Sequence, residues 1–431
     1  MLGVERRWSF DILMTPQKTL VLSRNYPNNV TSLLGLWTER FVRHISASCA
    51  VRVVAPVPYC PPLPGIPADY KRFRRVQPQR QDGGVIIYHP RFLVGPGYSL
   101  YNFEALLYYL SIRKLVDRIR REFRFELIHA HFSYPDGVVG AWLGKRYEVP
   151  VVVTEHACWQ PWMDQYPLVC RQAVRASRKI SFHIAVSEHV RSTIAHFTGS
   201  LERIRVIPVG VDGAVFSPAA PQPEFDPNQI LYVGFINQNK GIDVLLKAMC
   251  RLRKHRPDLS LVLVGGSFYR NSHRQREEVV ELAGKLELTD HVTFVGPKKP
   301  KEVARYMQQS SLLVLPSRRE SFGAVLVEAL ACGTPVVATR CGGPQDIVTD
   351  QVGVLVSPED VDALARGIEH VLGNRSAYNA DKLRNYALQR FSWGRVANDT
   401  VDVYREALEI RGGNHRKTFD KEISESTRAG Y

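Results

Sequence analysis

The chain has 431 residues, of which 45% are hydrophobic and 23% are charged, a composition typical of globular proteins rather than disordered ones. This length exceeds what one ordinary core contains, so two domains are expected. The net charge of +15 favours an acidic partner. The candidates are nucleic acid, an anionic membrane face and a phosphorylated ligand, and charge alone does not choose among them.

Neither the cysteines nor the apolar segments indicate secretion or membrane insertion. The seven cysteines are scattered without a CxxC pair or a Cys/His metal spacing, which is typical of reduced thiols in a cytosolic protein. The apolar run at 10–14 is too short for a signal peptide, and the apolar helical stretch at 101–112 is shorter than the roughly 20 residues that cross a bilayer. We therefore expect a cytoplasmic protein that can rest on the inner face of a membrane.

The first half of the chain alternates apolar, β-branched runs with helical patterns. Residues 1–17 lack periodicity and are expected to form a loose extension. Strands are predicted at 19–23, 51–55, 85–88, 127–131, 151–154, 180–185 and 205–209, and helices at 35–48, 101–122, 136–146 and 188–197. This alternation predicts a parallel sheet covered on both faces, in a domain of residues 18–215.

A proline-rich linker at 216–228 separates this domain from a second series of the same kind at 229–390. Its strands are predicted at 230–233, 261–264, 292–295, 312–315, 336–338 and 353–356, and its helices at 243–255, 274–286, 301–309, 323–331 and 361–372. An amphipathic helix within 391–411 follows, and the polar tail 412–431 is expected to be disordered. The predicted fold is α/β, with two doubly wound Rossmann-like domains facing across a cleft.

Two glutamates flank the turn that follows the strand at 312–315. Glu320 lies in the polar loop, Gly323 opens an Ala/Leu-rich helix, and Glu328 lies on that helix. Ligands of open α/β sheets bind beyond the carboxyl ends of the strands, and a helix N-terminus suits a diphosphate. The two carboxylates are therefore candidates to hold the hydroxyls of a sugar and of a ribose, although an isolated pair of glutamates is more often a loop charge and an ordinary helix residue.

Other strand ends carry polar residues or glycines that would meet at the same crevice. Lys240 precedes a helix after the strand at 230–233 and is a candidate point charge for a diphosphate, with a surface lysine as the alternative. His131 ends the strand at 127–131 and would face the cleft, although a lone histidine is more often structural. His156 is the weaker candidate at the next strand end. No Asp-x-Asp follows an apolar strand, so no obligatory metal is expected.

Basic residues concentrate in the first domain, at 71–75 and 113–124, and the second group follows the aromatic-rich stretch 98–109. This combination suits an anionic membrane face or the capture of a lipid-phosphate acceptor, with a solvated helix as the equal alternative. Nucleic-acid binding is not expected, because no helix-turn-helix, RRM or zinc-finger pattern is present.

The segment from Glu320 to Glu328 continues as Ala-Leu-Ala-Cys-Gly-Thr-Pro-Val-Val-Ala-Thr339, followed by Gly-Gly-Pro at 342–344 and Gly-Val-Leu-Val at 353–356. This succession resembles the C-terminal signature of family 4 retaining glycosyltransferases, which have the two-domain GT-B fold. The segments 131–137 and 151–156 are similar to a subgroup that builds bacterial cell-surface polysaccharides, such as the teichuronic acid glycosyltransferases.

The resemblance implies a role for each candidate. Glu320 would contact the donor sugar, Glu328 the ribose and Lys240 the diphosphate, and His131 would lie beside the reacting centre. The sugar and diphosphate would also be lined by Ser321, Phe322, Gly323 and Ala324. The helix within 391–411 would pack back on the first domain.

The implied reaction moves a sugar, with retention, from a UDP- or GDP-sugar to a hydroxyl of a glycan or lipid-linked acceptor, with no other cofactor. Two positions depart from the family pattern. Phe235 stands where many members have the arginine that pairs with Lys240 on the diphosphate, and Val209 stands where asparagine is usual. A nucleotide-sugar 2-epimerase, or a degenerate nucleotide-sugar-binding partner, remains an alternative.

Overall fold

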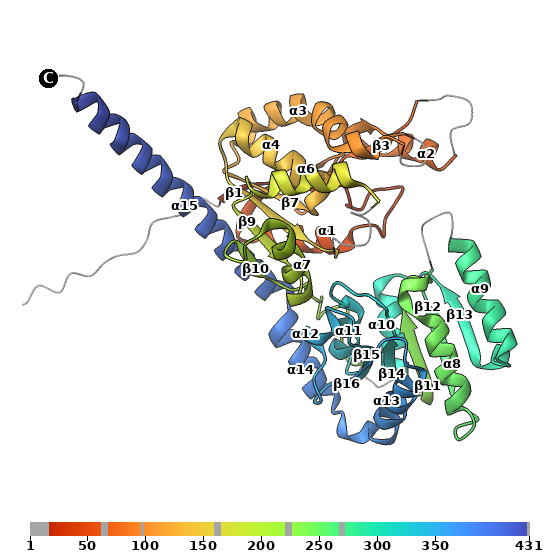
Figure 1. The fold of residues 1–431 in the computed structure, drawn as a ribbon. Coiled ribbons are helices and arrows are strands. Elements are labelled where there is room, and N and C mark those ends of the chain that lie inside the picture. The colour runs from red at the N-terminus through yellow and green to blue at the C-terminus, as the bar shows by residue number, and fades with distance from the viewer. Residues whose placement is uncertain are drawn as a thin grey trace, which may run out of the picture.

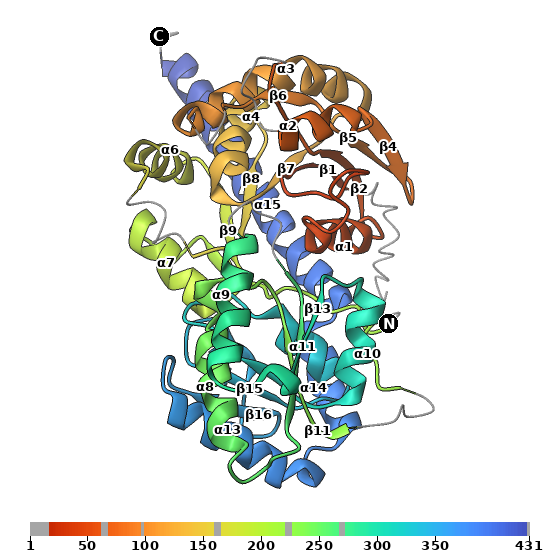
Figure 2. The same ribbon diagram turned by 90° about the vertical axis from the view of Figure 1, so that its right-hand side faces the viewer.

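The computed structural model describes residues 17–61, 68–95, 99–158, 165–219, 226–266 and 272–428, and at 68–69, 272–273 and 412–428 it describes the backbone alone. Two α/β units lie one above the other, and a long C-terminal helix runs from the lower unit along the upper one (Figures 1 and 2). The prediction of two doubly wound domains is confirmed. The extension expected at 1–17 lies outside the described residues, apart from Gln17 at the start of the first strand.

The N-terminal unit is built on an eight-stranded sheet. Its strands, in spatial order, are β10 (Ile204–Val206), β9 (Phe182–Ala185), β8 (Val151–Glu155), β7 (Leu127–His131), β1 (Gln17–Leu22), β2 (Cys49–Val54), β5 (Val85–Tyr88) and β4 (Gln79–Asp82). All neighbours are parallel except β4, which pairs antiparallel with β5. The two are joined by Gly83 and Gly84, both at positive φ, the backbone that a two-residue hairpin turn requires.

Helices cover both faces of this sheet. They are α1 (Leu36–Ile45), α2 (Ala68–Arg72), α3 (Glu104–Phe123), α4 (Val138–Tyr147), α6 (Pro167–Ser177) and α7 (Glu188–Thr198), and a two-stranded sheet of β3 (Val57–Tyr59) and β6 (Arg91–Leu93) lies beside them. The buried residues of α3, α4 and α6 pack in one core on one face, and those of α1 pack in a second core on the other. The sequence interpretation missed α2, α6, β3, β4 and β6.

The C-terminal unit is built on a six-stranded, all-parallel sheet. In spatial order its strands are β13 (Val292–Gly296), β12 (Ser260–Val264), β11 (Asp226–Val233), β14 (Ser310–Leu315), β15 (Val336–Thr339) and β16 (Gly353–Val356). Its helices are α8 (Ile242–Leu252), α9 (Ser272–Lys285), α10 (Pro300–Gln309), α11 (Ala324–Ala331), α12 (Pro344–Ile347), α13 (Val361–Gly373) and α14 (Ala380–Phe391).

Each sheet has one point at which the strand order reverses. In the first sheet β1 lies between β2 and β7, and in the second β11 lies between β12 and β14. Chains that leave two such neighbouring strands diverge to opposite faces and leave a crevice, which is where open α/β sheets bind ligands. The loops after β1 and β7, and after β11 and β14, are therefore the segments in which to look for a site.

The last helix, α15 (Trp393–Arg428), returns to the N-terminal unit (Figure 1). Trp393, Val396 and Tyr404 are buried in the same core as the apolar face of α1. The Tyr404 hydroxyl lies 2.6 Å from Nδ1 of His129, in the middle of the N-terminal sheet. The helix continues through 412–428, where the sequence predicted a disordered tail.

His183 in β9 offers a test of this core. It is buried, and neither ring nitrogen has a hydrogen-bond partner among the described residues. Burial lowers the pKa of His183 from 6.5 to about 4. Between these two pH values the unfolded chain binds a proton that the folded chain does not, so stability falls as the pH falls through this window.

We expect His183→Leu to raise the free energy of unfolding by about 1 kcal/mol at neutral pH, because an unsatisfied polar group is replaced by an apolar one. The difference in free energy of unfolding between the variant and the wild type should be larger at pH 5. At that pH the unfolded wild-type chain binds a proton at His183 that the folded chain does not. Urea denaturation at pH 7.5 and pH 5 measures both values. The exposed His255→Leu serves as the control. Destabilisation at both pH values would contradict the prediction.

Candidate active site

The centre of the candidate site is an ion pair between the loops after β11 and β14. Nζ of Lys240 lies 2.5 Å from Oε2 of Glu320, and the two side chains are only 19% and 15% exposed. Ser317 also donates its hydroxyl to Oε2 of Glu320, at 3.3 Å. The two residues that the sequence assigned to sugar and diphosphate are thus in contact at the point where the strand order reverses.

The backbone holds both residues in place. The Glu320 N–H donates to the carbonyl of Cys341 at 3.2 Å, and its carbonyl accepts from the Gly343 N–H at 2.9 Å, so the loops after β14 and β15 are joined. Behind Lys240, Gly241 has a φ of 62°, and a Cβ there would lie 2.1 Å from the carbonyl oxygen of Pro316. Only glycine allows this close approach of the two loops.

Arg318 holds the loop that carries Lys240 through several hydrogen bonds and ion pairs. Its guanidinium makes a bidentate pair with Asp243 at 2.8 and 2.9 Å, and its Nε donates to Glu359 at 2.9 Å. The Arg318 N–H also donates to the carbonyl of Asn239 at 2.7 Å. Arg318 therefore supports the loop that carries Lys240 and is not a free replacement for the arginine missing at Phe235, which is itself partly exposed.

The start of α11 lies directly behind Glu320. Gly323 precedes the helix with a φ of 95° and no side-chain cap, so the first N–H groups of α11 are not satisfied by a capping side chain. Ala324, the first residue of the helix, is half-buried. The ring of Phe322 is buried against Phe391, which leaves only its backbone for a ligand. This helix start suits an anionic group.

Ser321 connects the two units. Its Oγ accepts from the Cys158 N–H at 3.2 Å, and its carbonyl accepts from the Ser187 hydroxyl at 2.6 Å. At the first residue of α7, directly after Ser187, the Glu188 N–H donates to Asp346 at 2.7 Å. The candidate site therefore lies at the junction of the units rather than on one unit alone.

Glu328 already has a partner from the other unit. Its Oε1 lies 3.7 Å from Nη1 of Arg40, which projects from α1. Burial raises the pKa of Glu328 to about 7, and the nearby Arg40 opposes this rise. The carboxylate expected to bind a ribose is thus paired across the junction, and Arg40 is a residue that the sequence interpretation missed.

His131 lies in a stack of three histidines instead of facing open solvent. It is 1% exposed, and its ring stacks on His129, with centroids 4.6 Å apart, and on His156, with centroids 5.2 Å apart. Its Nδ1 lies 2.9 Å from Nε2 of His156. Burial, followed by the neighbouring His129 and His156, lowers the pKa of His131 well below its usual value. His156 is half-buried and is the more accessible of the two candidates.

Glu155 organises the loops after β7 and β8. This buried carboxylate accepts from the Ser133 N–H at 2.9 Å and from the N–H groups of His156 and Ala157, both at 3.1 Å. It thereby joins the turn after His131, in which Phe132 has a φ of 73°, to the chain that leads to Cys158. Glu155 directly follows the strand predicted at 151–154, but the sequence gives no sign that its carboxylate binds backbone rather than ligand.

A second buried network joins the loops after β1 and β7. The Arg24 N–H donates to Oδ1 of Asp136 at 2.8 Å, and the Tyr108 hydroxyl donates to the same oxygen at 3.2 Å. The Arg24 guanidinium pairs with Glu104 at the start of α3. Burial raises the pKa of Asp136 to about 7. The two loops at the reversal point of the N-terminal sheet are thus held together by polar contacts, as in the other unit.

This fold and this site define a two-domain glycosyltransferase with the GT-B fold. The family model of glycosyltransferase family 4 matches residues 37–215, and the model of glycosyl transferases group 1 matches residues 217–390. The D-inositol 3-phosphate glycosyltransferase of Paenarthrobacter aurescens is 31% identical over 322 residues, which cover 68% of this chain and 76% of that protein. The chain belongs to glycosyltransferase family 4, and it is a glycosyltransferase.

Solved structures agree on the fold. The sucrose-phosphate synthase of Thermosynechococcus elongatus superposes with a TM-score of 0.76 at 22% identity, over 91% of this chain and all of that one. Anabaena HepE in complex with UDP-glucose superposes with a TM-score of 0.68 at 21% identity, over 90% of this chain and 99% of that one.

Proposed function

We propose that the chain transfers a sugar, with retention of configuration, from a nucleoside-diphosphate sugar to a hydroxyl of a glycan or lipid-linked acceptor in cell-surface polysaccharide synthesis. The contact between Lys240 and Glu320, beside the uncapped start of α11, carries this proposal. A cation and free N–H groups suit the diphosphate, and a carboxylate a few ångströms away suits sugar hydroxyls. The UDP-glucose complex of HepE supports UDP as the first donor to test, with GDP as the second.

In the proposed reaction the protein supplies position and charge instead of a strong base. Lys240 and the start of α11 stabilise the negative charge that develops on the leaving diphosphate, and the diphosphate takes the proton of the acceptor hydroxyl. Glu320 holds the sugar, with Ser321, Gly323 and Ala324 around it. No metal is required, because Lys240 provides the positive charge. Glu328 binds the ribose after its contact with Arg40 opens.

Neutral histidines suit this mechanism better than charged ones. Burial lowers the pKa of His156 to about 3 and holds the pKa of His131 well below its usual value. Both rings are therefore uncharged at neutral pH. A neutral ring can accept or donate one hydrogen bond beside the sugar without competing with Lys240 for the diphosphate. We propose His131, with His156 above it, as the residue on the N-terminal side of the reacting centre.

A thermal-shift screen against UDP, GDP and their sugars identifies the donor, because a ligand that binds only the native state raises its stability. Product analysis with the preferred donor then tests the reaction, and the anomeric configuration of the new linkage is read by NMR. An α-linked product from an α-linked donor is expected. Free nucleotide together with an epimerised sugar and no acceptor product would instead indicate a 2-epimerase. Tight binding without turnover on any acceptor would indicate a degenerate binding partner.

We also propose that the N-terminal unit contacts an anionic membrane through α3. Phe103, Leu106 and Leu110 are 56%, 44% and 45% exposed and lie on one face at the start of this helix. The basic residues Arg113 and Lys114 are exposed on the next turn. An apolar face followed by basic residues suits the surface of an anionic bilayer. Among the described helices, none combines the length and apolar character that a membrane crossing requires.

Replacing Phe103, Leu106 and Leu110 together by serine is expected to lower binding to phosphatidylglycerol vesicles about tenfold or more, because the apolar area that enters the interface is lost. Co-sedimentation with vesicles measures the bound fraction. The matched control replaces Leu201, Val280 and Ile410, which are exposed apolar residues elsewhere, by serine. Equal binding of the two triple variants would argue against α3 as the contact face.

A further inference from the structure

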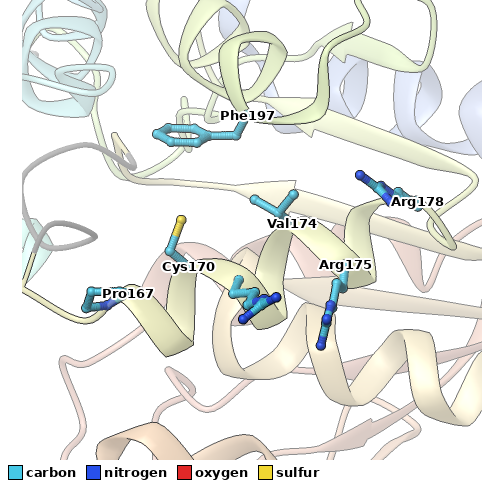
Figure 3. Close-up of a pocket in the computed structure, with 7 residues that line it drawn as sticks. Pro167, Cys170, Val174, Arg175, Arg178 and Phe197 are labelled. Carbon is cyan, nitrogen blue, oxygen red and sulfur yellow. The ribbon is translucent and has the colours of Figure 1, made fainter.

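A large hollow lies between α6 and α7, away from the Lys240–Glu320 pair. Its volume is about 690 Å³. Cys170 and Val174 of α6 point across the gap toward Phe197 of α7, and Arg178 lies beyond Val174 at the end of α6 (Figure 3). Arg171 and Arg175 also line the hollow. The lining thus combines apolar side chains with three arginines, so the hollow suits a molecule that has an apolar part and an anionic part.

Among the residues that the structure describes, no carboxylate pairs with the arginines around this hollow. Residues 165–187 contain no Asp or Glu, and Lys179 follows Arg178 directly. Within the described residues, the guanidinium groups of Arg171, Arg175 and Arg178 form no ion pair with a carboxylate. The neighbouring helices differ, since Arg146 on α4 is paired with Asp117 and Arg191 on α7 with Glu188. Uncompensated arginines beside an apolar floor favour an anionic ligand.

A smaller hollow on the opposite flank of α6 extends the same chemistry. It has a volume of about 220 Å³ and is lined by Trp142 of α4 together with Arg175 and Lys179. In Figure 3, Arg175 points away from Phe197. Cations therefore lie along both flanks of α6, and Arg175 lines both hollows.

The position of α6 relates this hollow to the two faces already described. Leu168, near its start, is exposed, and Gln172 donates to the carbonyl of Asn102 at 2.9 Å, directly before Phe103. On the other side the hollow borders α7, at whose start the Ser187 hydroxyl donates to the carbonyl of Ser321 beside Glu320. The hollow thus lies between residues next to the apolar face of α3 and a helix whose start contacts the C-terminal unit.

We propose that the α6–α7 hollow binds the acceptor through a phosphate group carried on a hydrocarbon chain, with the chain on Cys170, Val174 and Phe197 and the phosphate on the arginines. Arginine forks match phosphate oxygens, and the volume suits a ligand of this size. A glycan joined to an isoprenoid or acyl chain through a phosphate combines the two and offers a sugar hydroxyl for the transfer. This assignment rests on the proposed sugar transfer and specifies its lipid-linked acceptor.

Binding of farnesyl phosphate to the full chain, below its micelle concentration, tests the proposal by isothermal titration. The triple variant Arg171→Gln, Arg175→Gln, Arg178→Gln is expected to bind at least about tenfold more weakly, because charge-assisted hydrogen bonds are lost. Farnesol and inorganic phosphate should each bind at least about tenfold more weakly than farnesyl phosphate to the wild type, since each offers one half of the ligand. UDP binding to the triple variant should remain unchanged.

The matched control removes three exposed cations of the C-terminal unit, with Lys254→Gln, Arg305→Gln and Arg366→Gln. It should bind farnesyl phosphate as the wild type does. Equal losses in the two triple variants would show a general charge effect and overturn the proposal, as would wild-type binding by the arginine variant. If farnesyl phosphate binds at the arginines but no nucleoside diphosphate binds at all, the proposed sugar transfer fails while this site stands.

Discussion

Glu320→Ala is expected to reduce sugar transfer at least about a thousandfold while leaving the fold intact. The side chain lies at the junction of the two units with its carboxylate on Lys240, and no part of the core depends on it. Its removal takes away the group proposed to hold the donor sugar and also leaves Lys240 without its partner. Release of nucleoside diphosphate in the presence of acceptor measures the loss, and the far-UV circular dichroism spectrum checks the fold.

Glu369→Ala is the matched control for this variant. Glu369 is also a carboxylate of the C-terminal unit paired with a cation, at 2.9 Å from Arg256, but it lies on the surface. Exposed pairs of this kind contribute about 0–1 kcal/mol, so the control should retain wild-type activity and nearly wild-type stability. Full activity of Glu320→Ala would remove this carboxylate from the mechanism. Equal losses in both variants would indicate a general effect of charge.

Much of the C-terminal unit could be predicted, because each of its strands is an apolar run followed by a distinct loop. The loops after β11 and β14 became ligand-binding candidates from their place at strand ends, and the family resemblance gave their residues roles. That Lys240 contacts Glu320 could not be predicted in the same way, since 80 residues separate them. Their contact depends on β11 lying next to β14, and strand order is a property of the assembled sheet.

The N-terminal side of the site was harder to predict for a physical reason. Periodicity places His131 at the end of a strand, but it does not say that His156 from the next strand will cover it. Nor does it pair Glu328 with Arg40, because that contact joins two units of the chain. The helix α6 was missed because its buried face is narrow and consists only of Val169, Ala173, Ala176 and Ser177. Such features are set by tertiary packing rather than by local pattern.

Lys240→Ala is expected to lower kcat/KM for the donor about a hundredfold, because the only cation within contact of Glu320 in the described site would be lost from the diphosphate position. If Lys240 acts on the developing charge of the leaving group, kcat should fall more than the affinity for the donor does. Initial rates over a range of donor concentrations separate the two. Lys247→Ala, an exposed lysine further along α8, is the control and should leave both parameters unchanged.

Phe235→Arg tests the proposed diphosphate site by adding a cation instead of removing one. Phe235 lies in the loop after β11, five residues before Lys240, and its side chain is 40% exposed, so an arginine can be accommodated there without opening the core. A second cation beside Lys240 should tighten UDP binding about tenfold through a charge-assisted contact with the diphosphate. The gain should disappear when the ligand is uridine, which lacks the phosphates. An equal gain for UDP and uridine would mean that residue 235 contacts the nucleoside, and Lys240 would then act on the diphosphate alone.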